Sequence, residues 1–148
     1  MNELESALTA LCEELGLERP QADRRGRYEL RVEDMVLRVG PWNRNEVVLE
    51  GVIGSMGEGA ASHWESQQEL LRTVLTWNLA RLKGQARPEV LSFDEEENNL
   101  LLWRSWPIDG ALVRNLLSGA EEMLNELEFW RSKIASVAPS FGQSGGRP

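Results

Sequence analysis

The chain has 148 residues and a formal net charge of −8 at neutral pH, from 24 acidic and 16 basic side chains. Hydrophobic residues make up 41% of it, which is ordinary for a folded globular protein and too high for a disordered one. No apolar run approaches the roughly 20 residues of a membrane-spanning helix. An acidic chain repels phosphate backbones, so nucleic-acid binding is disfavoured. The acidity itself fits either solubility or attraction of a basic partner.

Cysteine content and chain ends indicate the compartment and the extent of the domain. A single cysteine, Cys12, excludes an internal disulfide and fits a reducing compartment. The N-terminus is acidic and lacks the basic start of a signal peptide, so we expect a cytoplasmic protein without stable membrane insertion. We expect one domain over residues 1–135 and a disordered tail over residues 136–148, which contain Pro, Ser and Gly.

The first predicted element is an amphipathic helix over residues 3–15. Apolar side chains recur there at helical spacing, and Gly16 is a suitable stop. The apolar face consists of Leu4, Leu8, Leu11, Cys12 and Leu15.

Three strands are predicted next, over residues 27–33, 35–39 and 46–53. The first alternates apolar with charged side chains, which is typical of a half-buried strand, and Gly40-Pro41 ends the second. Because the connections are short, the three strands should form an antiparallel meander. The inward-facing positions of the first strand are Tyr28, Leu30 and Val32.

A second helix is predicted over residues 62–83, with Ser62 and Glu65 as a capping box and Gly84 as its end. Its apolar residues cover roughly half of the helix circumference, with Asn78 near the middle of the arc. An arc this wide exceeds what contact with one sheet requires, so we expect the helix to be covered on a second side. The apolar positions are Leu70, Leu71, Val74, Leu75, Trp77, Leu79 and Leu82.

The C-terminal part should contain two strands, over residues 89–93 and 100–105, joined by an acidic turn. Asp109 then caps a long helix to about Ala135, whose glutamates face mostly outward and whose Phe129 points away from the apolar stripe. The predicted class is α+β, an antiparallel twisted sheet with helices in the order α-β-β-β-α-β-β-α. The inner face of the last helix consists of Leu112, Leu116, Leu117, Ala120, Met123, Leu124, Leu127, Trp130 and Ile134.

The residues that carry catalysis in small enzymes are scarce here. Cys12 lies on an apolar helix face, where packing is the usual role, and one histidine, His63, excludes a multi-histidine metal site. The acidic run 94–97 lacks the spacing of a calcium loop, and the glycine-rich segment 51–59 lacks phosphate-loop spacing. The sequence therefore predicts no enzyme, no cofactor and no metal. A small enzyme assembled across a dimer is the alternative with least support.

Tryptophan is abundant, with six residues in the chain. Trp130 fits the inner face of the last helix. Trp42 lies in a strand connection and Trp64 in the first turn of a helix, so either a structural role or contact with a partner fits them.

Four stretches carry a resemblance to a known family: LRTVLTWNL at 71–79, PEVLSFD at 88–94, LLLW at 100–103 and LNELEFW at 124–130. Together with the size, acidity and element order, they make the chain resemble the class I type III secretion chaperones, the Tir-chaperone family, over roughly residues 3–134. The resemblance implies a homodimer formed through the second helix and the fourth strand. The implied interface residues are Leu71, Val74, Leu75, Asn78, Leu79, Leu82, Val90 and Leu91.

The resemblance also implies a second partner. In this family the N-terminal segment of a secreted effector winds around the dimer, docks in apolar grooves and adds an edge strand. The function implied is that of a chaperone in the bacterial cytoplasm that keeps an effector soluble and export-competent. The alternative is a regulatory protein on the same scaffold that sequesters a regulator or another chaperone. The implied effector-binding residues are Leu4, Leu8, Leu11, Tyr28, Leu30 and Val32.

Overall fold

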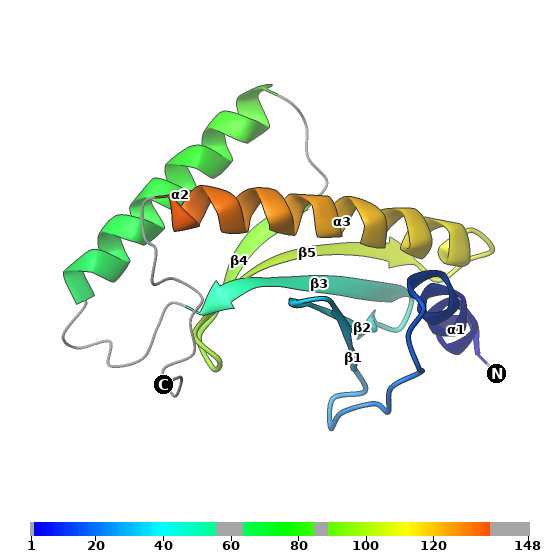
Figure 1. Cartoon of the computed structure of the whole chain (residues 1–148). Helices are drawn as coiled ribbons and strands as arrows, with labels where there is room; N and C mark the ends of the chain where they lie inside the picture. Colours follow the sequence, from blue (N-terminus) through cyan, green and yellow to red (C-terminus); the bar gives the residue numbers. More distant parts are fainter. Residues whose placement is uncertain (1, 56–63, 85–88, 137–148) are drawn as a thin grey trace.

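The computed structural model of the chain describes residues 2–55, 64–84 and 89–136, and at 64–67 and 82–84 the backbone alone. The predicted α+β class and element order are confirmed (Figure 1). The elements are α1 (Glu3–Leu15), β1 (Tyr28–Val32), β2 (Met35–Asn43), β3 (Glu46–Ser55), α2 (Trp64–Gly84), β4 (Val90–Asp94), β5 (Asn99–Pro107) and α3 (Leu112–Ala135).

The described strands form one antiparallel sheet in the order β1-β2-β3-β5-β4, so β1 and β4 are its edges. The meander expected for the first three strands is confirmed. Helix α3 packs along β3 and β5, and α1 packs against α3 and β2 (Figure 1). One face of the sheet is therefore covered by helices of the same chain.

The strand register separates the two faces of the sheet. Leu37, Gly51 and Leu102 are partners across β2, β3 and β5, and all three are buried on the face toward α3. A Cβ atom at Gly51 would lie 2.7 Å from the sulfur of Met123, so α3 lies close against the sheet there. The next register partners, Arg38, Glu50 and Trp103, point to the opposite face, because side chains alternate along a strand. We call this the outer face.

The start and end of α1 follow local rules. The Asn2 side chain accepts a hydrogen bond of 2.7 Å from the Glu5 backbone N–H, which satisfies one of the free donors of the first turn. Gly16 ends the helix in the left-handed region, with φ of 70°. The predicted bounds of this helix are confirmed.

Two local predictions are wrong. Gly40-Pro41 does not end β2, which continues to Asn43. The β1–β2 pairing extends only to Val39, so Pro41 lies past these hydrogen bonds, where its missing N–H is tolerated. Asp109 does not cap α3: its carboxylate accepts a hydrogen bond from the Ala111 backbone N–H, and the helix begins at Leu112. Ser62 and the predicted tail beyond Ser136 lie outside the described residues.

Candidate functional site

Helix α2 is attached to the C-terminal half of α3 by a few specific contacts. The Arg81 guanidinium donates to both carboxylate oxygens of Glu126, at 2.8 and 2.7 Å, and lies 3.8 Å from the centroid of the Phe129 ring. The Lys133 ammonium lies 5.2 Å from the centroid of the Trp77 ring. A bidentate Arg–carboxylate pair fixes orientation as well as distance, so these contacts determine which face of α2 points outward.

The outward face of α2 is apolar. Leu75 is 52% exposed and Leu79 54% exposed, and four residues place them one turn apart on the same side of the helix. On edge strand β4, Val90 is 45% exposed. Adjacent large apolar side chains left in water mark interaction surfaces more often than isolated ones do. We call Leu75 and Leu79 the α2 surface.

The structure sorts the predicted dimer residues into three groups. Leu75, Leu79 and Val90 are exposed, whereas Leu71, Asn78 and Leu91 are half-buried. Val74 is a correction: its side chain is fully buried in the core of the single chain, so it has no surface to offer a partner. The side chain of Leu82 lies outside the described residues.

The predicted effector-binding set needs a larger correction. Leu8, Leu11 and Leu30 are buried core residues, because α1 packs against α3 and β2 and covers them. Their side chains are therefore not available to a partner. Leu4, Tyr28 and Val32 are half-buried, at the margin of the same core or beside it.

The outer face of the sheet contains a cleft that the sequence did not predict. Its volume is about 520 Å³, and its apolar lining includes Trp42, Val48, Leu101 and Trp103, which define what we call the tryptophan cleft. The Trp42 and Trp103 rings stack at a centroid distance of 5.6 Å. Trp42 was expected in a strand connection, but it lies near the end of β2, where it is 57% exposed. Val48 and Leu101 are buried but do not belong to the main core cluster.

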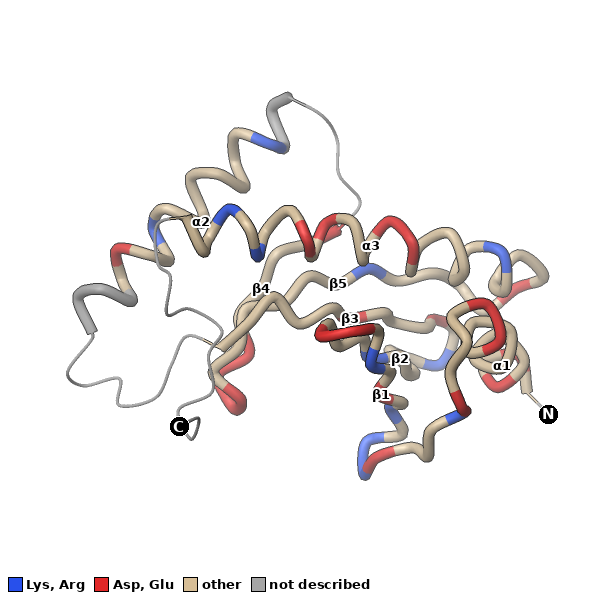
Figure 2. Tube along the Cα trace, in the orientation of Figure 1, with Lys and Arg blue, Asp and Glu red and all other residues tan. Residues whose placement is uncertain are grey.

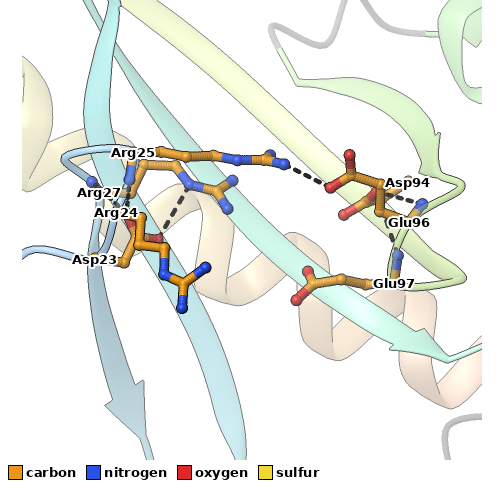
Figure 3. Close-up of a pocket in the computed structure, with 7 residues that line it drawn as sticks. All are labelled: Asp23, Arg24, Arg25, Arg27, Asp94, Glu96 and Glu97. Atoms are coloured by element: carbon orange, nitrogen blue, oxygen red, sulfur yellow. Dashed lines mark hydrogen bonds and ion pairs between the residues drawn. The ribbon is translucent and has the colours of Figure 1, made fainter.

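Charged side chains surround one end of this cleft. The segment before β1 is basic and the β4–β5 turn is acidic (Figure 2). Arg25 pairs with Glu96 and joins the two segments, and the Arg38 guanidinium on β2 donates to the Glu97 carboxylate at 2.6 Å, so a second ion pair ties the turn to the sheet (Figure 3 shows the first). The predicted acidic hairpin turn is confirmed, and it contacts residues far away in sequence.

Two buried carboxylates lie between the helices and the sheet. The glutamates of α3 were expected mostly on its outward side, but Glu126 is buried and bound by Arg81, because its spacing three residues after Met123 places it on the apolar stripe. A Glu89 carboxylate oxygen lies 3.6 Å from Arg104 and has no hydrogen-bond partner among the described residues. Burial raises the pKa of Glu89, and the Arg104 charge offsets this only in part.

Among the described residues, the candidates for chemistry are not grouped into a site. Cys12 is buried, and this burial raises the pKa of its thiol, which disfavours the reactive thiolate. His63 lies outside the described residues. Over residues 2–55, 64–84 and 89–136, no three metal-ligating side chains come together. None of the helices in the described part of the chain is long and apolar enough to cross a membrane.

Comparison with known proteins identifies the family. A sequence model described as the Tir chaperone protein (CesT) family matches residues 6–131. The chain belongs to this family. It is a class I type III secretion chaperone, as its resemblance implied. A comparison with curated proteins finds no match.

Two solved structures share this fold. A chain of the crystal structure of the ExsC–ExsE complex superposes with a TM-score of 0.63 at 17% identity, covering 90% of this chain and 97% of its own. A chain of the HopA1–SchA chaperone–effector complex gives a TM-score of 0.59 at 18% identity, covering 88% of this chain and 94% of its own.

Proposed function

We propose that this chaperone is a homodimer that binds the N-terminal segment of a type III secretion effector in the bacterial cytoplasm and keeps it soluble and export-competent. The observation that supports the dimer best is the α2 surface. Leu75 and Leu79 are each about half exposed on a helix whose other side is fixed by Arg81 and Val74. A second copy of the helix, related by a two-fold axis, would bury the same leucines on both protomers.

The site geometry supports binding without catalysis. Membership in a chaperone family gives the general role, and the buried Cys12 thiol is unsuited to act as a nucleophile. What the chain does offer is exposed apolar surface on α2, on β4 and in the tryptophan cleft. We take residues 1–135 as the single binding domain and residues 136–148 as a tail.

Co-expression with secreted proteins encoded beside the gene tests the proposal. We expect the tagged chaperone to co-purify with one of them, and light scattering during size-exclusion chromatography to give two chaperone chains per effector. Removal of the effector's N-terminal segment should abolish the complex. A strictly monomeric chaperone that retains no secreted protein would contradict the proposal.

The regulatory alternative stays a prediction on the same scaffold. Capture of a folded regulator in that experiment, with effector secretion unchanged when the chaperone gene is deleted, would favour it over effector binding.

A further inference from the structure

The tryptophan cleft leaves costly apolar surface in water. Trp42 is the most exposed of the large hydrophobic side chains on the described residues, and it stacks on Trp103 rather than packing into the core. On the same outer face Val48 and Leu101 are buried apolar residues outside the main core cluster, and the register places them on opposite sides of the Glu50–Trp103 pair. Stacked, partly exposed tryptophans flanked by buried aliphatic side chains are suited to hold one large apolar side chain of a partner.

The two sides of the cleft carry opposite charges. On one side is Arg25 in the segment before β1, and on the other is the turn with Glu95 and Glu96, while Arg24 lines the smaller cavity next to the cleft (Figure 3 shows Arg24, Arg25 and Glu96). Neither Arg24 nor Glu95 forms an ion pair within the described residues. A smaller cavity of about 240 Å³, lined by charged side chains alone, lies beside the tryptophan cleft and shares Arg25, Arg27, Asp94 and Glu96 with it.

The ion pairs that span this region differ in strength. Arg25 and Glu96 are 60% and 71% exposed, so water and salt screen their attraction and the pair opens readily. Arg38 is 11% exposed and also faces Glu29, so its bond to Glu97 holds the turn in place more firmly. The Arg25–Glu96 pair can therefore separate while the turn stays anchored through Glu97.

We propose that the tryptophan cleft binds an extended segment of the secreted partner in which a large apolar residue lies between a basic and an acidic residue. The apolar side chain lies on Trp42 and Trp103, the basic residue pairs with Glu95 and Glu96, and the acidic residue pairs with Arg24 and Arg25. Binding thus exchanges one exposed internal ion pair for two intermolecular ones. The occupant is taken from the proposed chaperone function, whereas the cleft and its charges are observed in the structure.

Labelled synthetic peptides of roughly 12 residues test the cleft directly by fluorescence anisotropy. The first carries a central Phe between Lys and Asp, the second carries Ser in both charged positions, and the third replaces Phe by Ala. We expect the first to bind the full-length chaperone most tightly and the third not to bind. Trp42→Ser should weaken binding of the first about tenfold, because stacking is lost. The matched control Val113→Ser, an exposed apolar residue on α3, should leave it unchanged.

The charges are tested by Glu95→Gln. This exposed change should weaken the Lys/Asp peptide about threefold and leave the Ser peptide unaffected, and the difference should shrink at high salt. Equal effects on both peptides, or no effect of Trp42→Ser, would overturn the proposal. A loss of chaperone dimer in Trp42→Ser would also overturn it, because the cleft would then belong to a second copy.

These results separate the cleft from the chaperone function. An effector that co-purifies equally well with Trp42→Ser and the unmodified chain would refute the cleft and leave the function standing. Peptide binding that needs Trp42, in a protein that retains no secreted partner, would support the cleft and refute the function.

Discussion

The dimer is best tested by truncating the α2 surface without disturbing the single chain. Leu75→Ala and Leu79→Ala together remove the exposed ends of two side chains, and Ala favours the helical backbone. Val74→Asp is unsuitable, because Val74 is fully buried within the protomer and the charge would unfold the chain whether or not it dimerises.

The expected loss follows from the exposed fractions. Full burial of a leucine contributes about 1.5–3 kcal/mol, so the half that is still exposed at Leu75 and Leu79 contributes about 1 kcal/mol each. A symmetric dimer buries these two leucines on each protomer, which contributes about 4 kcal/mol to association. Alanine at the same positions retains roughly a quarter of this free energy. The remaining loss of about 3 kcal/mol corresponds to a dimer dissociation constant roughly 100-fold higher.

Sedimentation velocity over a dilution series measures this constant. Far-ultraviolet circular dichroism should show an unchanged helix content, and Val113→Ala, which truncates an exposed apolar side chain on α3, should dimerise like the unmodified chain. A double variant whose dissociation constant stays within about threefold of the original would refute the interface. A threefold change corresponds to only about 0.7 kcal/mol, which is too little for the loss of leucines buried between the protomers.

Three further predictions concern the fold. Gly119→Ala places a Cβ atom 2.2 Å from the Trp106 ring and should lower the free energy of unfolding by about 1–3 kcal/mol. The control Gly110→Ala meets no atom within 4 Å and should change the free energy of unfolding by less than about 0.5 kcal/mol. Equal urea midpoints for the two variants would contradict this packing. Leu8→Glu buries a charge in the core and should leave little folded protein by circular dichroism; a folded variant with weakened effector binding would restore the groove first predicted there. Glu89→Gln should raise the urea midpoint at pH 7 and not at pH 4. Burial raises the pKa of the Glu89 carboxyl, so the protonated carboxyl contributes stability below its unfolded-state pKa. This contribution is lost as pH rises through the folded-state pKa. A variant with a lower urea midpoint than the original at pH 7 would show that the Arg104 pair dominates.

Much of the fold was determined by the sequence itself. The alternation around Leu30, the stripe of α3 and the stop at Gly16 are local patterns, and each produced the element expected. Periodicity acts within one element and requires only that an apolar face be covered. For that reason the class, the element order and the wide apolar arc of α2 could be predicted before any contact was known.

Which apolar residues remain exposed was decided only by the tertiary structure. Val74 and Leu75 are neighbours on one arc, yet the contacts of Arg81 with α3 bury the first and leave the second in water. In the same way Leu8 belongs to the core because α3 covers it.

The tryptophan cleft also depends on the tertiary structure. Trp42 contacts Trp103 only because β2 and β5 lie on either side of β3 in the sheet. The same topology brings the segment before β1 within reach of the β4–β5 turn, so that Arg25 pairs with Glu96. Chain topology and strand register set these long-range contacts, and no local pattern contains them. The sequence therefore determined that this protein has apolar faces to cover, and the folded chain determined which of them are left for partners.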